Sequence, residues 1–276
     1  MTAVVADPAR PATRAPGTVR LGLVRAGLEL RQFSREKEGV VFTLAFPVVL
    51  LAIFGTVFNR DIAPGVSFTQ YFVAGMIAAG LVGACFQNLA IQIPVERDKG
   101  ALKRLSGTPM PPAAYFIGKV VMVGGVATAS TILMLGIGVA FFGVSLPATP
   151  GRWGAFAVIW ILGVTACTLA GIAFSSVPRS GRTAPAVVSP IVILLNFISG
   201  VFFVYTDLPG WMRQIASVFP LKWMCQGMRY VFLPNDFAGA EPAGSWELGR
   251  IVLVLAAWAV AGLVLCRLTF RWQKST

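Results

Sequence analysis

The sequence predicts an all-α integral membrane protein with six transmembrane helices, from two features of its composition. Hydrophobic residues make up 56% of the 276 residues and charged residues only 12%, whereas soluble domains carry about 25% charged residues. Six segments are each apolar over the roughly 20 residues that a helix needs to cross the hydrocarbon core. They run over about 40–58, 68–93, 115–142, 153–177, 185–205 and 249–268.

The residue types also exclude several classes of chemistry. The chain has no histidine, and its cysteines are far apart with no C-x-x-C pair, which argues against a zinc site, a redox motif or a disulfide framework. It has no G-x-x-x-x-G-K-[ST] stretch and hence no P-loop of its own. We expect no metal or other cofactor in this chain. The net charge of +12 would suggest nucleic acid in a soluble protein, but too little polar sequence remains for one.

The distribution of Lys and Arg predicts the orientation in the membrane. The N-terminal 39 residues, the 94–114 and 178–184 loops and the tail from Arg267 hold 16 basic residues, and the alternate loops hold six. Because cytoplasmic loops carry the excess of Lys and Arg, we expect both termini in the cytoplasm. The tails at 1–17 and 269–276 would lie there, the first of them disordered.

The segment before the first span has an amphipathic pattern. Leu21, Val24 and Leu28 recur at helical spacing among arginines and lysines, which is typical of a helix lying in the membrane interface. The alternative is a basic flank that only anchors the first span.

The loop between the second and third spans begins at Pro94 and ends in proline-rich sequence. Residues 96–105 could form about two helical turns, with an apolar edge surrounded by charge. Two interpretations remain open for this segment: a solvated loop, or a short cytoplasmic helix that docks into a partner protein.

The segment after the fifth span holds two short apolar stripes. Leu208, Trp211, Met212, Ile215 and Phe219 follow helical spacing until Pro220, and Met224, Met228 and Phe232 form a second stripe. Neither half is long enough to span, so we expect two short re-entrant helices at the outer leaflet.

The spans carry neutral polar groups and no Asp or Glu. Because intramembrane carboxylates mark proton pathways, their absence weighs against a proton-coupled transporter. Lys119 lies close enough to the cytoplasmic end to snorkel. Gln87, Asn88 and Gln92 must face protein or water, so they either join helices or line a translocation path.

The order of these features resembles the permease subunit of an ABC-2 type transporter, in the drug-resistance branch of bacterial exporters. The stretch from Glu96 to Leu105, then Thr108-Pro109 and Gly118-Lys119, is similar to that family's cytoplasmic pattern. Here Ala101 replaces the usual Thr and Lys103 the usual Glu. The stretch from Leu208 to Arg229 looks like the family's outer re-entrant helices.

The resemblance implies an N-terminal connecting helix and an ATPase-coupling helix formed by Glu96, Arg97, Asp98, Lys99, Gly100, Leu102, Lys103, Arg104 and Leu105. It implies two permeases, as copies or paralogues, capped by two separate cytoplasmic ATPases that bind ATP and Mg. It places the protein in the bacterial plasma membrane.

By the same analogy, the second and fifth spans shape the path. This makes Asn196, Phe197, Phe202 and Phe203 lining candidates, although each Phe could equally face lipid. An amide and aromatic surface suits an amphipathic or lipid-like substrate, such as a drug, antibiotic or lipid.

Two other functions compete with this exporter. A secondary transporter or channel would work without an ATPase. A membrane enzyme acting on lipids would need nucleophiles or metal ligands gathered at one membrane face, and the sequence holds no such cluster.

Overall fold

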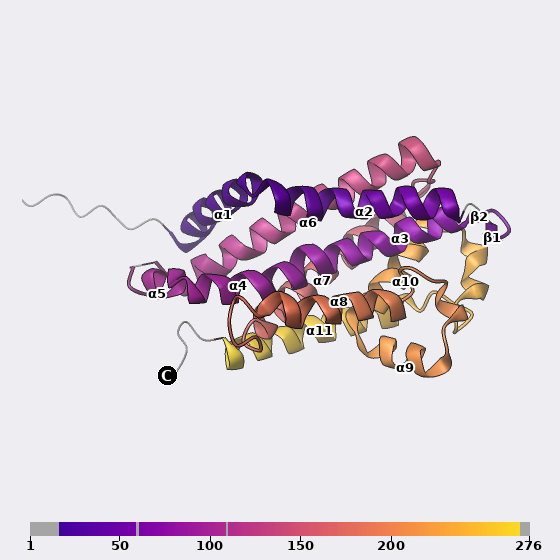
Figure 1. Ribbon diagram of the computed structural model, residues 1–276. Helices are drawn as coiled ribbons and strands as arrows, with labels where there is room; N and C mark the ends of the chain where they lie inside the picture. The colour runs from indigo at the N-terminus through magenta and orange to yellow at the C-terminus, as the bar shows by residue number, and fades with distance from the viewer. Residues whose placement is uncertain (1–16, 59–60, 109, 271–276) are drawn as a thin grey trace, which may run out of the picture.

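The computed structural model describes residues 17–58, 61–108 and 110–270, which form an elongated bundle of helices (Figure 1). Nearly all of both predicted tails, and Pro109 of the Thr-Pro pair, lie outside the described residues. The short helix α5 lies at one end of the bundle, called here the α5 end, and a small β-hairpin lies at the other (Figure 1).

Five helices in the described part of the chain are long and apolar enough to cross a membrane. They confirm an all-α integral membrane fold and correspond to five of the six expected spans. Their bounds are Lys37–Val57 (α2), Phe68–Asp98 (α3, η1 and α4 in sequence), Pro112–Phe142 (α6), Pro150–Phe174 (α7) and Leu248–Thr269 (α11).

The second span is longer than expected and contains a π-helical segment. The helix passes from α3 (Phe68–Leu81) through η1 (Val82–Gln87) into α4 (Asn88–Asp98), with Pro94 inside it. Proline in a helix removes a hydrogen bond, but Pro94 is buried in the bundle, where packing offsets that loss. The predicted separate helix at 96–105 is therefore wrong in its first turn.

The fifth apolar segment, by contrast, is shorter than expected. Helix α8 (Ala184–Ile198) continues through Pro190 and ends seven residues before the predicted boundary at 205. Gly200 follows with φ of +78°, and a Cβ there would lie 2.9 Å from Tyr205 Cβ. At about 1.5 Å per residue, the 15 residues of α8 fall short of the roughly 30 Å hydrocarbon core.

The remaining elements surround these helices. The predicted interfacial helix is α1 (Thr18–Arg35), which packs along α6. The loop between the first two expected spans holds the β1–β2 hairpin (Asp61–Ala63 and Val66–Ser67). Its turn contains Gly65, with φ of +70°. The shorter helices are α5 (Ala101–Ser106), η2 (Tyr205–Asp207), α9 (Gly210–Val218), α10 (Pro220–Phe232) and η3 (Asn235–Ala240).

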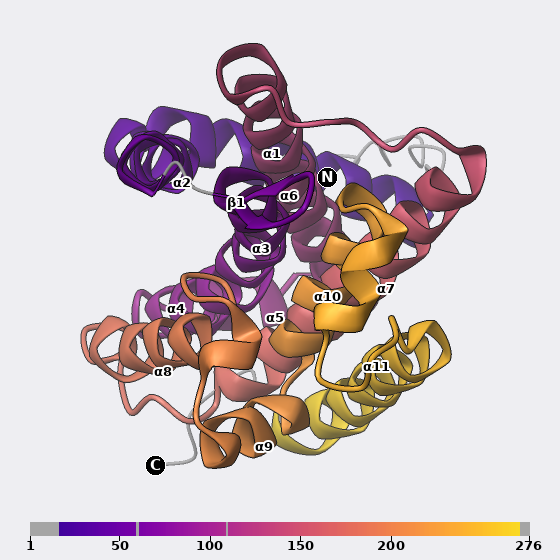
Figure 2. The same ribbon diagram turned by 90° about the vertical axis from the view of Figure 1, so that its right-hand side faces the viewer.

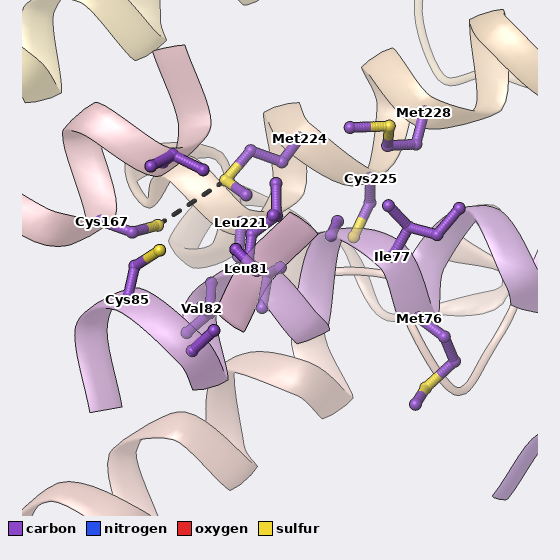
Figure 3. Close-up of a cluster of buried hydrophobic side chains, with 14 of the residues drawn as sticks. Met76, Ile77, Leu81, Val82, Cys85, Cys167, Leu221, Met224, Cys225 and Met228 are labelled. Atoms are coloured by element: carbon purple, nitrogen blue, oxygen red, sulfur yellow. Dashed lines mark hydrogen bonds between the residues drawn. The ribbon is translucent and has the colours of Figure 1, made fainter. Parts of the chain in front are cut away.

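The core lies around α10, which packs against α3, α7 and α11 (Figure 2). Met224 and Met228 are fully buried there, and Met224 Sδ lies 3.8 Å from Cys167 Sγ (Figure 3). Gly163 on α7 faces Met224, because a Cβ on it would meet Met224 Cε at 3.0 Å. The predicted pair of short helices is thus present, with its second member inside the core.

Candidate functional site

The α5 end of the bundle begins where α4 stops and the chain reverses. Gly100 caps α5 in a left-handed conformation with φ of +69°, which glycine adopts without steric cost. Glu96, Arg97 and Asp98 therefore belong to the last turn of the second span, and α5 itself begins at Ala101. Leu102 anchors α5 by its complete burial, and Leu105 is half-buried.

A buried group of charged side chains joins three helices next to this turn. Lys119 Nζ on α6 lies 2.5 Å from Glu96 Oε1 on α4 and 2.8 Å from Glu29 Oε2 on α1. Arg25 Nε donates to Glu29 Oε1 at 2.9 Å, and the Tyr115 hydroxyl donates to Glu96 Oε2 at 3.0 Å. These five residues are called here the charged junction.

The charges of the junction balance. Two cations, Arg25 and Lys119, face two carboxylates, Glu29 and Glu96. Lys119 is 0% exposed and Glu29 5%, so the expectation that Lys119 snorkels out of the bundle is wrong. Isolated charges are costly in such surroundings, and only close pairing with further hydrogen bonds offsets the cost. The junction therefore ties α1, α4 and α6 together at one point.

Two glycines bring α1 close enough to α6 for these contacts. A Cβ on Gly22 would lie 2.5 Å from Ile117 Cγ2, and a Cβ on Gly118 would lie 2.7 Å from Arg25 Cγ. Of the predicted membrane-facing stripe on α1, Val24 and Leu28 are exposed and Leu21 is half-exposed. The face that packs on α6 is instead formed by Gly22, Ala26 and Glu29.

The loop between α7 and α8 contacts the end of α4. Gly181 N donates to Asp98 Oδ2 at 2.6 Å, and a Cβ on Gly181 would lie 2.5 Å from Val95 Cα. Any larger residue would therefore force the loop away from α4. This contact places residue 181 beside the end of α4, at the α5 end of the bundle.

Among the other basic residues predicted for coupling, three are exposed and one is half-buried. Lys99, Lys103 and Arg104 are exposed. Arg97 is half-buried, and its Nε and Nη2 atoms have no hydrogen-bond partner among the described residues.

Helix α8 packs against η1 and α4, beside which it runs in Figures 1 and 2, and the predicted path residue Gln87 lies at this contact. Gln87 Nε2 donates to Ser189 Oγ at 3.4 Å across it. Asn88 and Asn196 each have a buried Oδ1 atom without a hydrogen-bond partner among the described residues, and Gln92 is half-buried.

The phenylalanines predicted to line the path lie at the end of α8. Phe202 stacks with Phe54 and packs beside Phe197, and Phe197 and Phe203 are partly exposed. An exposed ring in a membrane protein faces lipid or another subunit.

The two predicted outer stripes have different surroundings. Met224 and Met228 are buried in the core, whereas Trp211 and Ile215 on α9 are 60% and 47% exposed and Phe219 is half-buried. The apolar face of α9 is therefore free of contact with the described chain over much of its area.

A second buried ion pair holds the segment after α10 and has no obvious signal in the sequence. Arg229 on α10 binds Glu241 through Nε and Nη2 at 2.6 and 3.0 Å, and its guanidinium lies 5.0 Å from the Tyr71 ring centroid. Both charged side chains are almost fully buried. The two residues are 12 positions apart in the sequence, on either side of a loop, and no motif pairs them.

An apolar cavity of about 730 Å³ separates α6 from α7 in the half of the bundle away from α5. Its polar lining groups are satisfied within the protein: Trp160 Nε1 donates to Thr131 Oγ1 at 3.3 Å, and Thr128 bonds its own helix. Sequence patterns did not point to it, because its lining residues come from two separate helices and the loop between them.

A bundle of apolar helices long enough to cross a membrane defines a multi-pass membrane protein. The chain belongs to the ABC-2 type transporter family, whose model matches residues 26–233. It is therefore a membrane permease of the ABC-transporter class.

Curated relatives agree with this assignment. The chain is 24% identical to the inner membrane transport permease YadH of Escherichia coli strain K12, over 80% of this chain and 87% of that protein. It is 24% identical to the putative transport permease YvfS of Bacillus subtilis strain 168, over 90% of this chain and 96% of that protein. It is 25% identical to the putative transport permease ycf38 of Porphyra purpurea, over 90% and 81% respectively.

Proposed function

We propose that this permease is the membrane subunit of an ATP-driven exporter in the bacterial plasma membrane. It moves an amphipathic or lipid-like substrate, such as a drug, antibiotic or lipid, out of the cytoplasm or the inner leaflet. A separate ATPase subunit binds ATP and Mg and supplies the energy. Family membership supports the permease role, and the charged junction is the observation that supports coupling to a partner.

The α5 end faces the cytoplasm in this proposal, with both termini on that side. The excess of Lys and Arg in the segments that meet there supports this orientation. Helix α1 then lies at the inner interface, with the exposed Val24 and Leu28 toward lipid and Arg31 and Arg35 toward the headgroups.

A pull on α5 passes into the membrane through rigid elements. Helix α5 is joined to α4 by the short turn at Lys99–Gly100, and α4 continues through η1 into α3 as one helix. The junction makes α1 and α6 move with α4, because separating them would strand buried charges. Movement of α4 changes its contact with α8, and Asn88 on α4 and Asn196 on α8 each carry an amide oxygen without a hydrogen-bond partner among the described residues.

The side chains of α8 and of the segment after it support the proposed substrate class. The amide oxygens accept hydrogen bonds, and the phenyl rings of Phe197 and Phe202 cover apolar surface, so a molecule with both kinds of group suits it. A second permease, identical or related, would complete the path in a dimer.

The competing function is a secondary transporter or channel without an ATPase, and reconstitution separates the two. Tagged permease is purified from native membranes in mild detergent, and its partners and bound ligands are identified by mass spectrometry. We expect an ATP-binding-cassette ATPase among the partners. We also expect transport by proteoliposomes only when ATPase and ATP are present.

Charge reversal at Arg97 and Lys103 tests the coupling side of the proposal. We expect R97E/K103E to abolish ATP-dependent transport while the protein still inserts and purifies as a dimer. Two results contradict the proposal: no ATPase is ever recovered and the double variant transports normally, or the purified permease alone transports along an ion gradient.

A further inference from the structure

The apolar cavity between α6 and α7 extends along both helices, over about the depth of one leaflet. On α6 its lining runs from Thr128, near the middle of the helix, to Ala140, a stretch that rises about 18 Å. One leaflet supplies about 15 Å of the hydrocarbon core. On α7 the lining begins at Trp153, in the first turn of that helix. The cavity therefore lies in the leaflet away from α5, between the middle of the membrane and its surface.

The walls of the cavity offer a ligand almost only apolar contact. Thr131 Oγ1 accepts a hydrogen bond from Trp160 Nε1 at 3.3 Å, and Thr128 and Thr131 each donate to a backbone carbonyl of α6. Trp153 Nε1 donates to Pro147 O at 3.0 Å. The other lining residues are apolar and uncharged: Ile132, Leu135, Gly136, Val139, Ala140, Leu146, Phe156, Ala157 and Ile161. A ligand of this cavity is therefore held by shape and by apolar contact.

The cavity is open on the side that faces the bilayer. Ile132 on α6 and Ile161 on α7 both line it, and they are 65% and 57% exposed. Small residues keep the space between the two helices open, among them Gly136 and Ala157. A Cβ on Gly136 would meet no other atom within 4 Å. A molecule dissolved in the membrane can therefore enter from the side without passing through water.

We infer that this cavity is a lipid site, which holds one phospholipid of the leaflet away from α5 by its hydrocarbon chain. The length of the cavity matches the depth to which such a chain reaches, and its apolar walls match the chain along that length. The atoms that line an empty cavity lack van der Waals partners on one side, and a chain supplies them. Because no charged residue lines the cavity, it selects the chain and not the headgroup.

The dimensions of the cavity also argue against a helix of another subunit as the occupant. A volume of about 730 Å³ spread over about 18 Å gives a mean cross-section of about 40 Å², whereas a helix 10 Å across needs about 80 Å². A compact apolar ligand would fit in width but would leave part of the length empty. A hydrocarbon chain fills both dimensions.

Native mass spectrometry of the full-length permease, purified in mild detergent, measures the phospholipid that each molecule retains. We expect wild type to keep one phospholipid and Gly136→Leu to lose it, because the leucine side chain occupies the space of the chain. Leucine is a better helix former than glycine, so this variant should fold, and thermal melting verifies that it does. Ala157→Leu, which fills the cavity from α7, should lose the lipid as well.

Gly154→Leu is the matched control for these variants. It makes the same change in the same half of the bundle, and a Cβ at Gly154 also meets nothing within 4 Å, but Gly154 does not line the cavity. We expect this variant to retain the lipid as wild type does. Phosphatidylethanolamine, phosphatidylglycerol and phosphatidylcholine should be retained alike, since the walls carry no charge.

Photo-cross-linking in nanodiscs locates the lipid. Phosphatidylethanolamine with a diazirine near the end of its chain should label residues 128–140 of α6 in wild type and in Gly154→Leu. The labelling of this stretch should fall in Gly136→Leu. The same lipid with the diazirine on its headgroup should leave these residues unlabelled, because the headgroup stays at the membrane surface.

Four outcomes overturn the lipid site, and none of them depends on the ATPase. Equal retention by wild type and Gly136→Leu would place the lipid elsewhere. Loss of the lipid from Gly154→Leu as well would show that the cavity is not responsible. Retention of phosphatidylglycerol alone would mean that a charged site holds the headgroup. If wild type retains a compact apolar molecule in place of a phospholipid, and Gly136→Leu loses it, the cavity binds that class of ligand and not lipid.

Discussion

Lys119 Nζ lies 2.8 Å from Glu29 Oε2, which joins a helix predicted to lie along the membrane to one predicted to cross it. The same nitrogen contacts Glu96 on the second span. One buried cation thus connects three helices whose relative movement any coupling to a partner must control.

Removing that cation should destabilise the protein. Lys119→Met leaves two carboxylates in a buried site with only Arg25 to compensate them, and breaking a buried pair costs about 3–5 kcal/mol. Unfolding in detergent, followed by intrinsic fluorescence, measures the loss. Val120→Met, on the exposed face of the same helix, should change stability by less than about 0.5 kcal/mol.

Adding Glu96→Gln to Lys119→Met should recover part of that loss, since one stranded carboxylate becomes neutral. An unchanged melting temperature in Lys119→Met would show that the junction does not hold the helices together.

The contact between the α7–α8 loop and α4 should depend on the absence of a side chain at residue 181. A Cβ on Gly181 would lie 2.5 Å from Val95 Cα, so Gly181→Ala must displace the loop and weaken its bond to Asp98. We expect lower ATP-driven transport at a similar expression level. Gly154→Ala is the control, because a Cβ there meets nothing within 4 Å. Equal transport by the two variants would contradict a role for this contact.

The ion pair of Arg229 with Glu241 should stabilise the fold without touching the α5 end. Arg229→Met strands the buried Glu241 carboxylate, with an expected loss of about 3–5 kcal/mol. Arg250→Met removes an ion pair in which Arg250 is 63% exposed, and such a pair contributes at most about 1 kcal/mol. Thermal melts of the two variants side by side distinguish these values, and similar melts would refute the buried pairing.

Thiol labelling should report the re-entrant position of α10. Cys85, Cys167 and Cys225 are buried, while Cys266 is half-exposed. We therefore expect a small maleimide to modify Cys266 alone in the folded protein and all four thiols after unfolding. A Cys266→Ser variant should remain unlabelled until it unfolds. Rapid labelling of Cys225 in that variant would show that α10 is not packed in the core.

Part of the fold could be predicted because membrane spans leave a local signal. A run of about 20 apolar residues is enough to identify α6, α7 and α11, and their observed bounds lie within a few residues of the prediction. Helix ends that depend on distant contacts were missed. The second span continues past a buried Pro94 to Asp98. Helix α8 stops at Ile198, and the chain then returns so that Tyr205 N donates to the Tyr71 hydroxyl.

The candidate site was predicted only in outline. The segment from 96 to 105 was recognised by its pattern, but its division at Gly100 depends on a left-handed turn. Glu29 was absent from the prediction, since nothing local distinguishes it from the other charged residues of α1. Its partner Lys119 is 90 residues away in the chain.

The sequence by itself determined the class of protein and the approximate helices, because hydrophobicity and helical spacing are properties of neighbouring residues. It also showed that most of the Lys and Arg residues lie in every second segment between the spans. Only the tertiary structure decided which charges face inward. Glu29, Glu96 and Lys119 balance one another inside the bundle, whereas Lys103 and Arg104 remain on its surface. That division arises because pairing of buried charges requires three separate helices to meet at one point.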